Sequence, residues 1–194
     1  MTPRLPIVVL VACLLAVGVA HAQDPDELFP NTKSRGRAAV EYRDDAIQAV
    51  AAYYYSQREH ESRWLLIEVA LVSEERMSLP RTAFRLVSPD GQEIAVAEQS
   101  QFAEDSTRTT PLLQNARSTR HNVTSYFRQQ RWEDLRFFTV PFGPVVQDEF
   151  VIDKTRVVSG DLFFVAPTGA WADGTYALVV EHEGTRASLP IVLE

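Results

Sequence analysis

WLLIEVALV, the sequence of Trp64–Val72, contains a single charged residue, Glu68. Alternate side chains of an extended chain point to opposite faces, and one face of this segment is wholly aliphatic. That face carries Leu65, Ile67, Val69 and Leu71. The other face carries Trp64, Leu66, Glu68 and Ala70, and we expect a central strand of a sheet.

Two β-hairpins are expected on either side of a less regular middle region. In the first, Thr82–Ser88 and Gln92–Ala97 flank a Pro-Asp-Gly turn sequence. Its inward-facing residues are expected to be Phe84, Leu86, Ile94 and Val96. In the second, Thr175–His182 leads through the tight turn Glu183-Gly184 into a returning strand. The alternating apolar residues of that strand are Ala187, Leu189, Ile191 and Leu193.

Further strands are expected at Leu135–Val140, Val145–Ile152 and Arg156–Val165, which are separated by turn sequences. Ala46–Tyr55 fits two structures, because its alanines favour a helix and its tyrosines favour a strand. We prefer the strand.

Residues 102–131 interrupt this β pattern. Thr110-Pro111 resembles a helix N-cap followed by proline at the first helical position, ahead of Leu112, Leu113 and Ala116. We expect a helical insertion here.

Many short strands and one inserted helix predict a mainly β protein built as a two-sheet antiparallel sandwich. We expect the sandwich domain to span residues 44–194, with the helical insertion at 102–131. Residues 23–43 contain an acidic Asp-Pro-Asp-Glu segment and read as a flexible leader.

The segment DGTYAL, residues 173–178, resembles the immunoglobulin-like strand in which a tyrosine, here Tyr176, precedes a core position, here Leu178, by two residues. The wider pattern of Trp64–Val72, FRLVSPDG at 84–91 and GDLFFVAP at 160–167 is similar to secreted telokin-like bacterial domains. This resemblance implies an immunoglobulin-like fold outside the cytoplasm. It implies no catalytic residues.

The first 22 residues have the features of a secretory signal peptide: Arg4, an uncharged run over residues 5–20, and an Ala-His-Ala ending. The run is too short for a membrane span, so we expect a periplasmic or secreted protein. Leu10-Val11-Ala12-Cys13 also resembles a lipobox, which would attach a lipid anchor at Cys13. The polar character that usually follows such a cysteine is missing.

The chain has a formal net charge of −7, which disfavours non-specific binding to nucleic acid or anionic lipid. Its single cysteine lies in the expected signal peptide, so disulfides and thiol catalysis are not expected in the exported protein.

Motifs for catalysis, metal binding and cofactor binding are missing from the sequence. His60, His121 and His182 lie in no recognisable catalytic motif. In Glu181-His182-Glu183, neighbouring strand residues point to opposite faces and cannot converge on one metal ion. We therefore expect neither metal nor cofactor.

The middle region combines arginines with aromatic residues, a composition favoured at protein interfaces. We take a predicted patch as the candidate binding surface: Arg117, Arg120, Tyr126, Arg128, Arg131 and Trp132. The alternative is that the aromatics pack on the sheet and the arginines are solvated.

The sequence thus favours an exported, non-enzymatic domain that binds a protein or another component of the cell envelope. Two alternatives stay open. One is a small envelope hydrolase that uses dispersed carboxylates or a histidine, and the other is a structural accessory domain.

Overall fold

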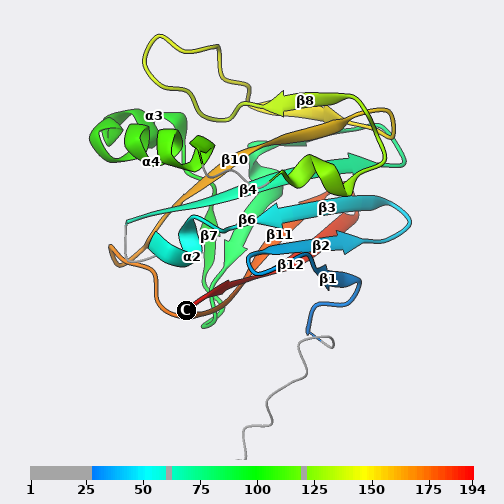
Figure 1. The fold of residues 1–194 in the computed structure, drawn as a ribbon, viewed down its shortest axis with the longest axis horizontal. Coiled ribbons are helices and arrows are strands. Elements are labelled where there is room, and N and C mark those ends of the chain that lie inside the picture. Colours follow the sequence, from blue (N-terminus) through cyan, green and yellow to red (C-terminus); the bar gives the residue numbers. More distant parts are fainter. Residues whose placement is uncertain (1–27, 60–62, 119–121) are drawn as a thin grey trace, which may run out of the picture.

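A computed structural model describes residues 28–59, 63–118 and 122–194 (Figure 1). Its largest sheet has six strands, whose spatial order is β1 (Thr32–Ser34), β2 (Ala39–Arg43), β3 (Ile47–Ala52), β4 (Trp64–Ser73), β10 (Val157–Val165) and β8 (Trp132–Leu135). The expected signal peptide, Cys13 included, lies outside the described residues.

A four-stranded sheet lies behind the first in Figure 1, with the order β12 (Thr185–Leu193), β11 (Gly174–His182), β6 (Phe84–Val87) and β7 (Glu93–Ala95). A two-stranded sheet pairs β5 (Met77–Pro80) with β9 (Glu149–Ile152). The helical elements are α2 (Ser56–Glu59), α3 (Gln99–Glu104), α4 (Ser106–Ser118) and the short 3₁₀ helices η1 (Arg81–Ala83) and η2 (Val123–Tyr126). The protein is therefore mainly β.

The central position expected for Trp64–Val72 is confirmed, because β4 pairs with β3 on one side and with β10 on the other. All ten of its residues are buried. Its inner face contributes to the core shared by the two large sheets, and its outer face packs beneath η2. Covering on both faces explains why this strand tolerates a nearly continuous apolar sequence.

Both expected hairpins are also confirmed. In the first, Leu86 pairs with Ile94, and the predicted inward-facing side chains are buried. In the second, Glu183 and Gly184 both have positive φ, of 47° and 82°, which suits a tight turn between twisted strands. Ala46–Tyr55 provides strand β3, as preferred.

The flexible leader predicted for residues 23–43 is wrong for its second half. Lys33 and Glu41 are register partners in the pair β1–β2, and β2 continues the sheet beside β3. Glu41 is a buried carboxylate that accepts a hydrogen bond from Gln48 Nε2 at 2.7 Å and pairs with Arg35. The buried carboxylate of Glu41 therefore has hydrogen-bonding partners inside the fold, which the amino-acid composition of the segment did not reveal.

Two details of the predicted topology need correction. The edge strand β8 runs parallel to β10, so the larger sheet is not purely antiparallel. The main helix begins at Ser106, and Pro111 lies inside it rather than at its start. The buried Thr109 hydroxyl donates to the carbonyl of Phe102 at 2.8 Å, which ties the first turn of α4 to α3.

Buried phenylalanines fill the core between the sheets and the helices. Phe102, Phe138 and Phe163 pack with ring centroids 4.9–5.2 Å apart. Beside them, the buried Arg81 guanidinium donates to the carbonyls of Ala97 and Phe137 at 2.8 and 2.9 Å. Burial lowers the pKa of Arg81. These bonds hold the chain in place just before it leaves the core at residue 139.

Candidate functional site: an apolar loop and the pocket beside it

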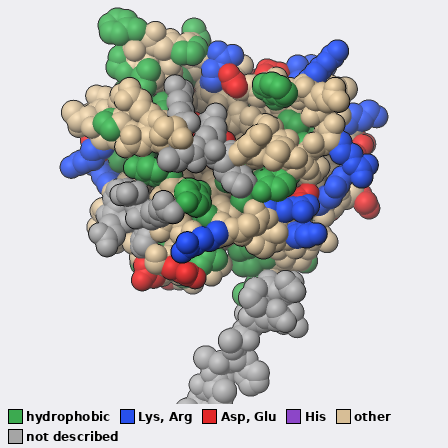
Figure 2. All heavy atoms as spheres, in the orientation of Figure 1, with side chains coloured by type: hydrophobic (Ala, Val, Ile, Leu, Met, Phe, Trp, Pro, Cys, Tyr) green, Lys and Arg blue, Asp and Glu red, His purple; other side chains and the backbone are tan. Residues whose placement is uncertain are grey.

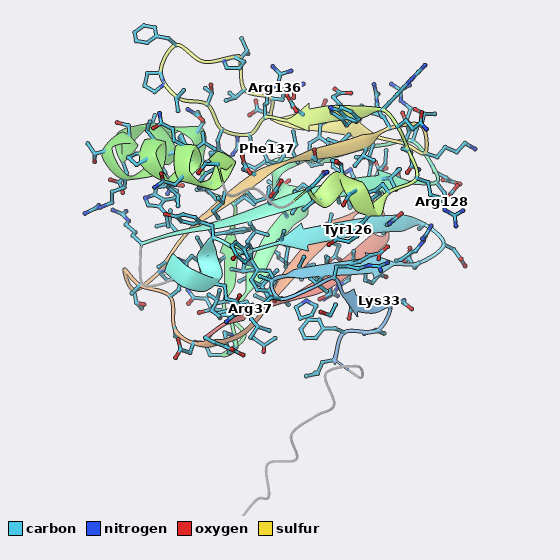
Figure 3. All side chains as sticks on the ribbon, in the orientation of Figure 1. Lys33, Arg37, Tyr126, Arg128, Arg136 and Phe137 are labelled. Atoms are coloured by element: carbon cyan, nitrogen blue, oxygen red, sulfur yellow. The ribbon has the colours of Figure 1, made fainter. Side chains whose placement is uncertain are left out.

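The structure describes the side chains of four residues of the predicted patch: Tyr126, Arg128, Arg131 and Trp132. Arg128 and Arg131 are exposed, and Trp132 is exposed at the start of the edge strand β8. Figure 3 shows Arg128 at the end of the molecule opposite α3 and α4. Arg120 lies outside the described residues, as does the side chain of Arg117.

Tyr126 contacts other parts of the protein through its hydroxyl, its ring and its backbone carbonyl. Its hydroxyl donates to the carbonyl of Arg35 at 3.1 Å, and the Arg35 guanidinium lies 5.6 Å from its ring centroid. Gln48 Nε2 donates to the Tyr126 carbonyl at 3.2 Å. With Val123 and Phe127, which are buried, Tyr126 covers the outer face of the larger sheet. The aromatic residues of η2 therefore pack on the sheet.

A different surface is exposed and apolar. We define the apolar loop as Val140–Val146, with the sequence VPFGPVV. Phe142 exposes its whole side chain, at 109% of the reference area, and Val145 exposes 85%. The loop projects beyond α3 and α4 in Figure 1, and Figure 2 shows hydrophobic side chains gathered over it.

The apolar loop is anchored at its base. Gln99 on α3 makes two hydrogen bonds to the Thr139 backbone: Nε2 donates to the carbonyl at 2.9 Å, and the Thr139 N–H donates to Oε1 at 3.0 Å. At the other end, the Gln147 N–H donates to the carbonyl of Arg136 at 2.8 Å. Both ends of the loop are therefore fixed to the body of the protein.

The tip of the apolar loop is a tight turn. The Gly143 N–H donates to the Val140 carbonyl at 2.9 Å, with Pro141 and Phe142 as the central residues. Phe142 has φ of 64°, a left-handed conformation that is costly for a bulky side chain. A Cβ at Gly143 would lie 2.1 Å from Thr139 Oγ1 and 2.9 Å from the Val140 carbonyl oxygen. The turn thus requires glycine at one position and strains phenylalanine at the other.

A pocket of about 280 Å³ lies beside the apolar loop. Val140 and Pro144 of the loop form part of its wall, and buried Phe138 and Phe163 are among its lining residues. Its polar lining comes from the neighbouring strands β8 and β10 and the chain after β8: Asp134, Arg136, Ser159 and Asp161.

Close contact between β8 and β10 shapes this pocket. Leu135 pairs with Gly160, and a Cβ at Gly160 would lie 2.3 Å from the Leu135 carbonyl oxygen. Asp134 and Ser159 are register partners in the same ladder. Within the described ranges, neither Asp134 nor Arg136 forms an ion pair or side-chain hydrogen bond, and both are exposed. Figure 3 shows Arg136 at the foot of the loop.

Among the described residues, His182 is the histidine that the sequence analysis considered. His60 and His121 lie outside them, and His182 is 3.7 Å from the exposed carboxylate of Glu183, away from the residues of this pocket. Over residues 28–59, 63–118 and 122–194, no three His, Cys, Asp or Glu side chains gather as a metal site would require. In those ranges, no helix combines the length and apolarity of a membrane span.

A second pocket, of about 300 Å³, lies at one end of the smaller sheet. Trp171 and Tyr176 line it and pack edge to face, with ring centroids 5.7 Å apart. The Tyr176 hydroxyl donates to the Ala172 carbonyl at 3.0 Å. Because Trp171 is buried, its ring offers no platform for stacking a ligand.

The sequence reasoning missed the apolar loop by treating Pro141–Pro144 as a separator between strands. The sequence did contain an indication of this loop, since Val140–Val146 is an uncharged run with proline and glycine that joins the end of one strand candidate to the start of the next. Such a run is either a buried strand or an exposed apolar loop, and its prolines oppose the strand.

A scan against protein-family models found no matching family, and searches of curated proteins and of solved structures also found no match.

Proposed function

We propose that this protein is an exported, non-enzymatic binding domain that recognises a protein partner through the apolar loop. The observation that carries the proposal is the complete exposure of Phe142 on a loop anchored at both ends. Backbone strain of this kind concentrates at functional sites, because the surrounding structure must hold it in place. Here it presents an aromatic side chain to solvent.

Burying Phe142 in a partner supplies about 1.5–3 kcal/mol from the hydrophobic effect alone. Aromatic side chains that enter a partner's pocket dominate many interfaces. Since the loop is already fixed by Gln99 and by the Gly143 turn, little conformational entropy is lost on binding.

A protein is favoured over a lipid surface as the partner. The chain has a net charge of −7, which opposes approach to anionic membranes. Phe142 and Val145 are the large hydrophobic side chains of the loop identified as exposed, and two such side chains provide a small anchor for a bilayer.

An immunoglobulin-like sandwich is the scaffold that we propose for this loop. The two large sheets, which share a core and are antiparallel apart from the pair β8–β10, support it, as does the hydrogen bond from the Tyr176 hydroxyl to the Ala172 carbonyl. The proposed location, periplasmic or secreted, rests on the signal-peptide features of the first 22 residues.

Site-specific photo-cross-linking tests the proposal. A photoreactive residue replaces Phe142 or, as a matched control, Leu28, another exposed apolar residue at 52% exposure. Each protein is irradiated with the envelope fraction of its own host. We expect a discrete protein adduct from position 142 and none at the same mass from position 28. Unlabelled wild-type protein should compete for this adduct, whereas Phe142→Ser should not.

Identical adducts from both positions would contradict the proposal. So would co-sedimentation with zwitterionic lipid vesicles that Phe142→Ser abolishes and Leu28→Ser leaves intact, because the loop would then be a lipid anchor.

A further inference from the structure

Trp132 differs from the other two tryptophans of the chain, because its side chain is exposed. Its exposed fraction is 68%, against 3% for Trp64 and 5% for Trp171. It lies at the start of β8, the edge strand of the larger sheet (Figure 1). An exposed indole offers a ligand a flat apolar face, which neither of the buried rings can do.

Polar groups lie beside this ring on the same face of the sheet. Alternate residues of a strand share a face and lie about 6.5 Å apart, so Asp134 is on the face of Trp132. The register partner of Asp134 in β10 is Ser159. Both line the pocket of about 280 Å³, together with Arg136, which follows β8. The indole face and a polar hollow are therefore neighbours on one surface.

Asp134 and Arg136 supply complementary hydrogen-bonding groups. A carboxylate only accepts hydrogen bonds, and a guanidinium only donates them. Both side chains are exposed, and over residues 28–59, 63–118 and 122–194 neither has an ion pair or a side-chain hydrogen bond. Asp161, the other carboxylate of the lining, already has an interaction within the protein. One acceptor group and one donor group are thus available to a ligand.

These groups favour a neutral ligand that is rich in hydroxyls. The available carboxylate and guanidinium have opposite charges, so neither a cation nor an anion gains a net attraction from the pair. A hydroxyl both donates and accepts, so neighbouring hydroxyls of one ligand can bond to Asp134 and Arg136 together. The negative face of an indole attracts the partly positive C–H groups of a sugar ring.

We infer that this surface binds a neutral saccharide chain, with one sugar ring stacked on Trp132 and adjacent hydroxyls bonded to Asp134 and Arg136. Rings whose substituents are all equatorial fit best, because they present a flat C–H face to the indole. Glucose and N-acetylglucosamine are sugars of this kind. The site adds a second ligand to the proposed protein partner and does not depend on the contacts of Phe142.

Indole fluorescence tests the stacking directly, because Trp132 is the one tryptophan of the three that a dissolved quencher can reach. Full-length protein is titrated with iodide, alone or with cellotetraose or chitotetraose, the tetramers of glucose and N-acetylglucosamine. We expect both tetrasaccharides to protect Trp132 from quenching, with dissociation constants on the order of millimolar. Sorbitol, which has hydroxyls but no ring, should give no protection.

A matched pair of substitutions tests the polar contacts. Glu133 precedes Asp134 in β8, and strand alternation turns its side chain to the opposite face. It pairs with Arg156 at 2.9 Å and does not line the pocket. Asp134→Asn should weaken binding of chitotetraose about fivefold, because a charged acceptor becomes a neutral one. Glu133→Gln should leave this binding unchanged.

Substitution of the indole tests the platform itself. In an NMR titration with chitotetraose, Trp132→Ala should weaken binding about tenfold, and Trp132→Phe should retain part of it, since a smaller aromatic face remains. The wild-type amides that shift should be those of residues 132–136 and 157–161.

Four results would overturn the inference. They are protection of Trp132 by neither tetrasaccharide, equal protection by sorbitol, tighter binding of the cationic glucosamine tetramer than of chitotetraose, and equal effects of Asp134→Asn and Glu133→Gln. A protein adduct from a photoreactive residue at position 132 that chitotetraose does not displace would also overturn it, because the surface would then bind protein.

Discussion

Two short segments with aromatic residues, Val123–Phe127 and the apolar loop Val140–Val146, have opposite environments in the same fold. The first buries Val123 and Phe127 against the outer face of the larger sheet. The second exposes Phe142 completely, although Gln99 and Gln147 fix its base. Of the residues predicted from composition to form the binding patch, Tyr126 lies in the first segment, which packs on the sheet. The second segment is the exposed loop that we propose as the binding surface.

The two segments should differ most in how much the free energy of unfolding falls when their phenylalanine is replaced by alanine. Phe127→Ala removes a buried ring beside Ala70 and Val72 and should lower the free energy of unfolding by about 3 kcal/mol. Apart from any gain from relieved backbone strain, Phe142→Ala should change the free energy of unfolding by no more than about 0.5 kcal/mol. Urea unfolding followed by circular dichroism measures both values. Equal losses would remove the distinction between the two segments.

Displacing β8 should disturb the pocket without touching the tip of the loop. Gly160→Ala places a Cβ against the Leu135 backbone and should destabilise the protein by about 2 kcal/mol. Hydrogen exchange should increase in residues 132–135. Unchanged exchange there would show that β8 does not depend on this close contact.

Relieving the backbone strain at Phe142 should raise the stability of the protein and at the same time abolish binding of the partner. Asparagine tolerates the left-handed conformation better than phenylalanine, so Phe142→Asn should raise the free energy of unfolding by up to about 1 kcal/mol. The same substitution should abolish the position-specific capture of a partner. If Phe142→Asn lowers the free energy of unfolding, or if it still captures the partner, the strain at this position is not connected with recognition.

Acid should weaken the hydrogen bond from Trp64 to Asp105, at the end of α3, more than the hydrogen bonds that anchor the apolar loop. The Trp64 Nε1–H bond to Asp105 is the main factor that lowers the pKa of this carboxyl below its ordinary value of 3.8. A lowered folded-state pKa adds stability at higher pH, and that stability is lost as the pH falls through the folded value. Asp105→Asn should therefore flatten the pH dependence of unfolding below about pH 4.

The loop anchor has no such dependence, because Gln99 and the Thr139 backbone do not titrate. Indole fluorescence during acid titration measures the effect at Trp64. An identical acid transition in wild type and Asp105→Asn would show that this carboxyl contributes nothing.

The sequence predicted those parts of the fold that alternate strictly. Strand β4 and the two hairpins β6–β7 and β11–β12 are confirmed, because their apolar residues recur at every second position beside clear turn sequences. Strand β2 was missed, since the burial of Glu41 depends on partners, Gln48 and Arg35, that a local pattern does not reveal.

The candidate site was less predictable for a similar reason. Whether Tyr126 or Phe142 is exposed depends on which segment covers the larger sheet, a tertiary property. The left-handed φ of Phe142 depends on a turn closed by Gly143 and held by Thr139. The pocket arises from parallel pairing of β8 with β10, which an antiparallel prediction did not include.

The central claim is that Phe142 is the main contact with a partner protein. Calorimetric titration of the protein identified by cross-linking at position 142 tests this claim most directly. Phe142→Ser should weaken binding by about thirtyfold, as expected for a dominant aromatic contact worth about 2 kcal/mol. Leu28→Ser should bind like wild type, and equal affinities for the wild type and Phe142→Ser would contradict the claim.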